Sequence, residues 1–274
     1  MSLVNQKIVS LICTVDEQLP NKSYAISLGR MGVEGVRGLS LKSAVFPNNF
    51  YNVIENDLAR KNNIFYFSLD GVPQQAEIPQ GFYNISDLMT RLELEINNII
   101  AVSGILPLPT LDIFVYSTLT KKVTISINGN GVNTEFTLQG LQNTQSINRL
   151  LGNSQDVTLT TDPLPDIYTF DSLINLQGET SVYLVSNTIA NNGGISNKGA
   201  DDGRNVSLIR QIPVNAPFGG SILYMSFDTD ADKIIYGSPV DLTDVQISVT
   251  DSSGNVLNLG VGKLQVELIC YLRL

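Results

Sequence analysis

The sequence contains no histidine and no tryptophan, and it has only two cysteines in 274 residues. Without histidine, the chain cannot build a Ser-His-Asp or Cys-His nucleophile or a metal site that needs an imidazole ligand. The two cysteines, Cys13 and Cys270, lie at opposite ends of the chain and cannot form a zinc knuckle. We expect two reduced core thiols, although a bridge between the terminal strands is also compatible with the sequence.

Charged residues are scarce, at 16% of the chain against about 25% in an ordinary soluble domain. The formal net charge is −9, and the largest basic groupings are the isolated pairs Arg60-Lys61 and Lys121-Lys122. Binding to nucleic-acid phosphates requires clustered lysine and arginine. We therefore expect no direct contact with nucleic acid, and a polar surface with few charges favours contacts between protein subunits.

Long apolar runs are absent. No stretch approaches the roughly 18 uninterrupted apolar residues of a membrane-spanning helix. The N-terminal run MSLVNQKIVSLICTVDEQLP lacks a charged segment followed by a sustained apolar one, and it is more typical of a strand than of a signal peptide. The sequence therefore predicts neither a membrane span nor a secretion signal.

Two short motifs resemble ligand sites. Asp228, Asp230 and Asp232 alternate as in a calcium loop, but the sixth position of such a loop is Lys233 instead of glycine, and the twelfth is Pro239 instead of glutamate. The run 260–263, GVGK, lacks the first glycine and the final Ser or Thr of a phosphate-binding loop. We assign no catalytic, cofactor-binding or metal-binding residues, and we expect no enzyme activity and no cofactor.

Alternation with a period of two residues dominates the chain and predicts strands with one buried face. Near the C-terminus, Val245, Ile247 and Val249 alternate with polar residues, and the last strand repeats the pattern from Leu264 to Cys270. A turn at 251–255, with Gly254 at positive φ, separates them. Further strands are expected at 6–14, 36–46, 63–69, 111–119, 122–128, 135–139, 179–186, 206–214 and 220–227. The run 128–131, NGNG, is a hairpin signal.

Two segments read as helix. In residues 85–100 the apolar side chains recur at spacings of three and four, with Asn84 as the N-cap. Residues 146–151 form a short helix that Gly152 closes. We expect one domain over residues 1–274, with an N-terminal strand or arm at about 1–35 and a flexible loop, rich in Gly and Asn, at about 191–205.

Several phrases recur in an order that resembles a known family. They are FPNNFYNV at 46–53, AEIPQGFYNISDLMTRLELEIN at 76–97, SINRLLGN at 146–153, SLIRQIPV at 207–214 and DVQISVTDSSGNVLNL at 244–259. From about Leu39 to the C-terminus, this order resembles the jelly-roll capsid proteins of virophages, Polinton-like elements and large nucleo-cytoplasmic DNA viruses. The resemblance implies an all-β fold, an antiparallel jelly-roll β-sandwich of about eight core strands, with the 85–100 helix across one edge.

The resemblance also implies a function. With one copy of each motif, the chain is similar to the single jelly-roll penton protein that closes fivefold vertices, although minor capsid proteins away from vertices share this fold. The implied partners are copies of the chain itself, in a homopentamer, and a double jelly-roll major capsid protein. The implied location is the virion, assembled inside the host cell. A carbohydrate-binding jelly roll and a receptor-binding fibre head are the alternatives; the absence of tryptophan counts against the first, and the absence of a shaft repeat against the second.

Overall fold

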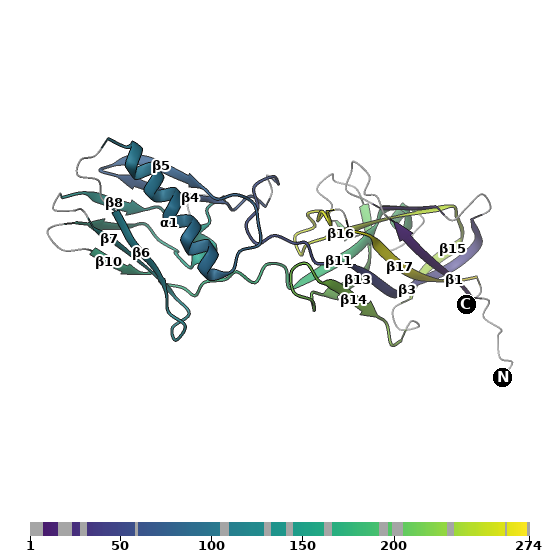
Figure 1. Ribbon diagram of the computed structural model, residues 1–274. Helices are drawn as coiled ribbons and strands as arrows, with labels where there is room; N and C mark the ends of the chain where they lie inside the picture. The colour runs from purple at the N-terminus through teal and green to yellow at the C-terminus, as the bar shows by residue number, and fades with distance from the viewer. Residues whose placement is uncertain are drawn as a thin grey trace. The chain divides into compact units, whose positions relative to one another are not determined.

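The computed structural model describes most of the chain, and its contacts divide the chain into two compact units. The sandwich unit comprises Met1–Phe50 and Glu179–Leu274, and the inserted unit comprises Tyr51–Gly178. The elements of both are labelled in Figure 1. The described residues are 8–15, 24–27, 32–57, 60–104, 110–128, 133–140, 145–161, 166–191, 197–198, 205–228, 233–260 and 262–272.

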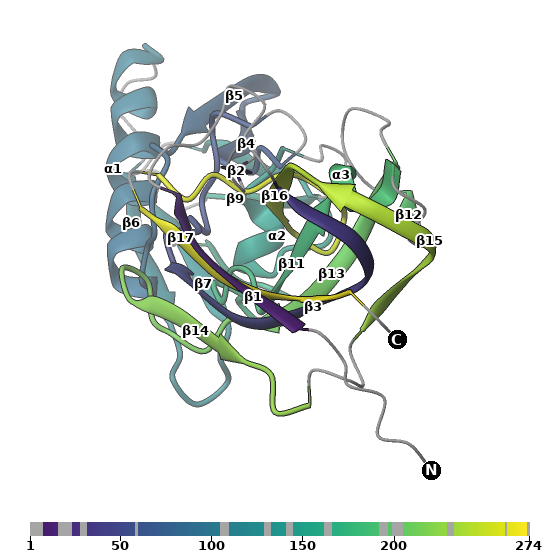
Figure 2. The same cartoon turned by 90° about the vertical axis from the view of Figure 1, so that its right-hand side faces the viewer.

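Two antiparallel sheets form the sandwich unit. The first has the order β1-β17-β3-β14, and the second has the order β12-β13-β11-β16-β2. Figure 2 shows β17 between β1 and β3. The bounds in the first sheet are β1 (Ile8–Val15), β17 (Leu264–Tyr271), β3 (Val33–Pro47) and β14 (Ser221–Met225), with β15 (Ile234–Leu242) also paired to β3. Those in the second are β12 (Asn197–Lys198), β13 (Asn205–Pro213), β11 (Ser181–Ser186), β16 (Asp244–Thr250) and β2 (Tyr24–Ser27), and α3 (Asn187–Asn191) contacts β13 and β16.

The order of the strands is that of a jelly roll. β14 and β15 pair with successive halves of one edge of β3, so together they act as one interrupted strand. The eight core strands along the chain are then β1, β2, β3, β11, β13, β14 with β15, β16 and β17. Numbered 1 to 8 in this order, they form one sheet with the order 1-8-3-6 and another with the order 2-7-4-5. This order folds the chain into two Greek keys. The predicted antiparallel jelly-roll sandwich is confirmed.

The predicted N-terminal arm takes part in the sandwich. β1 pairs with β17 along its whole length, and β2 pairs with β16, so residues expected in an arm supply the first and second core strands. In the predicted loop at 191–205, Asn197 and Lys198 pair with Val206 and Asn205 as β12. Residues 192–196 and 199–204 of that loop lie outside the described part.

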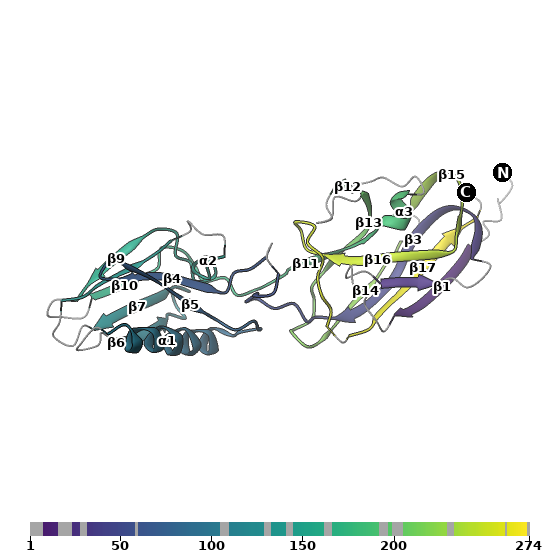
Figure 3. The same cartoon turned by 90° about the horizontal axis from the view of Figure 1, so that it is seen from above.

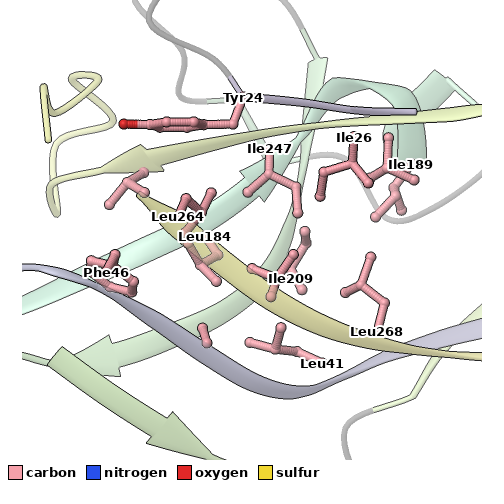
Figure 4. Packing of buried hydrophobic residues seen from close by; sticks show 14 of the residues in the cluster. Tyr24, Ile26, Leu41, Phe46, Leu184, Ile189, Ile209, Ile247, Leu264 and Leu268 are labelled. Carbon is pink, nitrogen blue, oxygen red and sulfur yellow. The ribbon is translucent and has the colours of Figure 1, made fainter. Parts of the chain in front are cut away.

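The core of the sandwich unit lies between the sheets. Figure 4 shows Leu41 and Leu268 of the first sheet pointing toward Ile209 and Ile247 of the second. The predicted inward-facing residues are all fully buried: Val245, Ile247 and Val249 in β16, and Leu264, Val266, Leu268 and Cys270 in β17. Burying one large aliphatic side chain contributes about 1.5–3 kcal/mol, so this layer holds the two sheets together.

The inserted unit has its own sheets and helices. One sheet has the order β5-β4-β8-β9 and the other β10-β7-β6, and α1 contacts β6 and β5 (Figure 3). The elements are β4 (Ile64–Leu69), β5 (Val72–Glu77), α1 (Ile85–Val102), β6 (Thr110–Tyr116), β7 (Val123–Asn128), β8 (Glu135–Leu138), α2 (Asn148–Leu151), β9 (Val157–Thr160) and β10 (Asp166–Thr169). A second hydrophobic cluster, which includes Phe65, Phe67, Leu92 and Phe136, fills this unit.

The long helix is confirmed and extends two residues beyond its predicted end. Asn84 is its N-cap, because its side-chain Oδ1 accepts a hydrogen bond of 2.9 Å from the backbone N–H of Asp87. The stripe of Leu88, Leu92 and Ile96 is fully buried. These residues pack in the cluster of the inserted unit, however, and not across an edge of the jelly roll as expected.

Two further expectations concern the division of the chain and a hairpin. We predicted one domain over 1–274; the contacts form two units with separate clusters, and whether these fold as one domain stays a prediction. The boundary at Phe50 lies inside the FPNNFYNV motif, where no Gly- or Pro-rich linker marks it. The second concerns the hairpin signal at 128–131, because β7 and β8 on either side of it belong to different sheets. The hairpin of β6 and β7 turns instead at Lys121, which has a φ of 58°.

Candidate functional site

The residues that suggested a metal site are only partly described. Asp228 follows β14, while Asp230 and Asp232 lie outside the described residues. Within the described ranges, no group of three His, Cys, Asp or Glu residues is placed to hold a metal ion. That the chain has no catalytic, cofactor-binding or metal-binding residues stays a prediction.

The positions of the two cysteines decide the question of a bridge. β1 and β17 are neighbours, but Cys13 lies opposite Val266 and Cys270 lies opposite Val9. The two cysteines are therefore four residues apart along the paired strands, or roughly 13 Å. A disulfide requires Cα atoms within about 7 Å, so Cys13 and Cys270 are not bridged to each other.

The outer face of the first sheet points away from the core and carries both polar and apolar side chains. Its middle is polar. The Glu267 carboxylate accepts hydrogen bonds from Lys42 Nζ at 2.9 Å, Ser10 Oγ at 2.8 Å and Ser43 Oγ at 3.4 Å. The hydrogen bond from Lys42 lowers the pKa of Glu267 most, and the bond from Ser10 lowers it next, so the pKa lies below its usual range. The charge is thus balanced within the chain, and Glu267 needs no partner from outside.

Both edges of this face are apolar. On β14 at one edge, Leu223 is 54% exposed and Met225 is 59% exposed, and Phe227 just beyond the strand is fully exposed. On β1 at the other edge, Ile12 is 67% exposed. When a partner covers an exposed apolar side chain, the assembly is stabilised by about 25 cal/mol per Å² of apolar surface buried. Covering these two edges would therefore stabilise an assembly.

A groove of about 640 Å³ runs beside β14. It is lined by Arg210, Pro213, Asn215, Leu223, Tyr224, Met225, Ser226, Phe227 and Asp228. The Arg210 guanidinium lies over the Tyr224 ring, with 5.4 Å between the guanidinium carbon and the ring centroid. Asn215 Nδ2 donates to the carbonyl oxygen of Leu223 at 3.2 Å. Arginine and aromatic residues in one apolar hollow are the composition of an interface centre.

Two residues in the motifs that carry the resemblance, Asn52 and Tyr83, hydrogen-bond to backbone groups. Asn52 Nδ2 donates to the carbonyl oxygens of Tyr83 (2.8 Å) and Leu176 (3.1 Å), and its Oδ1 accepts from the Tyr83 N–H. Tyr83 donates its hydroxyl to the Pro79 carbonyl oxygen and packs against the hydrophobic cluster of the inserted unit. Burial raises the pKa of Tyr83. Asn52 lies within the FPNNFYNV run, but no local pattern distinguishes it from the other asparagines of that run.

The acidic turn near the C-terminus is also structural. The Asp251 carboxylate accepts from the N–H groups of Ser253 and Asn255 and from Asn255 Nδ2, and Gly254 takes the predicted positive φ of 90°. It separates β16 from β17, and the two strands belong to different sheets.

None of the described helices combines the length and the hydropathy that a membrane-crossing segment requires.

Comparison with known proteins finds the fold but no relative in sequence. No family model matches the chain, and no curated protein matches it. Among solved structures, it is similar to the mavirus penton protein, with a TM-score of 0.55 and 10% identity, over 97% of this chain and 99% of that one. It also matches a chain of the Sputnik virophage structure determined by cryo-electron microscopy, with a TM-score of 0.45 and 12% identity, over 96% of this chain and 97% of that one. The predicted resemblance is confirmed at the level of the fold.

Proposed function

We propose that the chain is a structural capsid protein, the penton that closes the fivefold vertices of an icosahedral double-stranded DNA virus. One observation carries the proposal. The likeness to the mavirus penton protein covers nearly all of both chains, so it includes the inserted unit as well as the jelly roll. A sandwich shared with lectins or fibre heads would match over the jelly roll alone.

The chemistry of the chain fits this role. A shell protein works through lateral contacts, without a reaction or a cofactor. We propose that its partners are four further copies of itself, in a homopentamer, and a double jelly-roll major capsid protein. Its place is the virion.

The distribution of charge supports different roles for the two units. The inserted unit has 13 acidic and 6 basic residues, a net charge of −7, whereas the sandwich unit has 13 acidic and 11 basic residues, a net charge of −2. Copies of a nearly neutral surface approach each other with little repulsion, while strongly acidic surfaces repel. We propose that the sandwich unit builds the shell and that the inserted unit stays in water.

Imaging of assembled particles tests the proposal. The chain is co-expressed with the major capsid protein of the same virus, and the particles are reconstructed by cryo-electron microscopy. We expect density for the jelly roll at the fivefold vertices. Density on the quasi-sixfold faces, or a stable trimer of the purified chain, would contradict the penton assignment, and glycan binding by the isolated chain would favour the lectin alternative.

A further inference from the structure

We infer that neighbouring copies of the chain meet through opposite edges of the first sheet, with the β14 edge of one subunit against the β1 edge of the next. This inference rests on the proposed function, and it names the surfaces through which the copies associate.

The register across the first sheet carries the argument. Ile12 lies opposite Glu267, Glu267 lies opposite Ser43, and Ser43 lies opposite Met225. These four residues therefore form one row over the outer face, from the β1 edge to the β14 edge. The row begins and ends with an exposed apolar side chain and is polar between them. A contact made at both edges buries the apolar ends and leaves the polar middle in water.

The β14 edge lacks the features that keep edge strands apart. Exposed edges are usually protected by lysine, proline or inward-pointing charges. β14 has the sequence SILYM, with neither a charge nor a proline, and it pairs only with β3 among the described strands. Asn215 caps one carbonyl oxygen of this edge, that of Leu223. Such a strand is suited to being covered in the assembled state.

Phe227 and the groove beside it give this edge an anchor. A fully exposed phenylalanine leaves roughly 150–250 Å² of aromatic surface on water. It stands next to Tyr224, whose ring Arg210 covers, in the groove of about 640 Å³. Buried aromatic and arginine residues carry most of the free energy of association at interfaces. In the contact that we infer, the groove at the β14 edge of one subunit therefore accommodates the β1 edge of the next, which carries the exposed side chain of Ile12.

The occupant that we infer is a second copy of this chain, whose β1 edge offers an exposed apolar side chain on the side opposite to β14. A ring of identical subunits requires this heterologous arrangement, in which one flank meets another flank. The sandwich unit, with a net charge of −2, opposes the approach of its own copies only weakly.

Crosslinking of the full chain tests the pairing. Ile12→Cys and Met225→Cys are combined in a Cys13→Ser background, and the protein is treated at high concentration with a short bis-maleimide. We expect covalent oligomers of up to five subunits from the double variant, and only monomers from either single variant. Dimers from a single variant would show a twofold contact between like edges and would overturn the inference, as would a double variant that stays monomeric.

A charge substitution tests the same contact without crosslinks. Met225→Lys is expected to weaken self-association by at least about tenfold in Kd, measured by sedimentation or native mass spectrometry. Leu119→Lys is the control, because Leu119 is an apolar residue of the inserted unit that is even more exposed than Met225 (91% against 59%), and it is expected to leave Kd unchanged. Circular dichroism melts confirm that both variants fold. Equal Kd values for Met225→Lys and the parent protein would refute the inference.

The position of the chain in particles separates this inference from the proposed function. If the chain occupies fivefold vertices but both tests fail, the copies meet elsewhere and the penton assignment stands. If the chain is absent from vertices while β1 and β14 crosslink, the pairing stands and the penton assignment falls.

Discussion

The two units of the chain reach stable cores by opposite routes. In the sandwich unit, β17 pairs with β1 and with β3, so its partners come from the other end of the chain. In the inserted unit, β4 with β5 and β6 with β7 are hairpins, and α1 packs on neighbouring elements. Local contacts form with little loss of loop entropy, whereas distant ones form late. A locally folding unit can therefore be inserted between two strands of a jelly roll without disturbing its strand order.

The largest expected effect comes from a charge in the core of the inserted unit. Leu92→Asp places a carboxylate without a partner among buried apolar residues, which costs several kcal/mol. We expect hydrogen exchange to show loss of protection in α1 and β6, with β17 and β3 still protected. Leu94→Asp is the control, because Leu94 lies on the same helix with 49% of its surface exposed. Simultaneous loss of protection in both units would show that they unfold as one domain.

The converse substitution lies in the sandwich unit. Leu268→Ala removes a fully buried side chain of β17 and is expected to destabilise this unit by about 2–5 kcal/mol. Hydrogen exchange measured at increasing temperature should then show that β1, β3 and β17 lose protection before the inserted unit does. Leu223→Ala on the exposed side of β14 should change little in the monomer. An equal effect of the two substitutions would mean that the core of the sandwich is not where the structure places it.

A smaller effect is expected at the start of α1. Asn84→Ala removes the acceptor for the Asp87 N–H and should cost about 1 kcal/mol, confined to the inserted unit. Ser86→Ala, within the first turn, is the control, since Ser86 is exposed. Chemical denaturation monitored by helical circular dichroism measures the difference. Because Ala has a higher helix propensity than Ser, Ser86→Ala should cause no loss, and a loss as large as that of Asn84→Ala would contradict the role of the cap.

The smallest effect concerns Glu267 in the sandwich unit. Lys42 and Ser10 lower the pKa of Glu267 in the folded protein, so its stabilisation is present above the unfolded pKa, near 4.5, and disappears as the pH falls through the folded value. The pair of Glu267 and Lys42 should contribute less than about 1 kcal/mol at pH 7, because Lys42 is exposed. A double-mutant cycle of Glu267→Gln and Lys42→Met at pH 7 and pH 3 measures it. A coupling energy that stays constant between these two pH values would contradict the role of the carboxylate.

Several strands could not be predicted from the sequence, for physical reasons. β15 contains Gly237 and Pro239, and its pairing with β3 shifts register between Ile235 and Val240, so no regular alternation marks it. β5 begins VPQQ, with a proline and few apolar residues, and it survives as an edge strand where proline is tolerated. β9, β10 and β2 have four residues each, too few to show a period. These strands are held by their partners and not by their own sequences.

Features that depend on neighbours along the chain could be predicted from the sequence. Alternation set the buried face of β16 and β17, spacing set the stripe of α1, and Asn84 and Gly254 set a cap and a turn, because each of these is a local property of a few side chains and their backbone. The pairing of the strands, the division into two units and the apolar side chains that stay on the surface are seen only in the folded chain. Those outcomes depend on contacts between residues more than 200 positions apart, such as Ile12 with Glu267 and Glu267 with Ser43, and no local pattern specifies them.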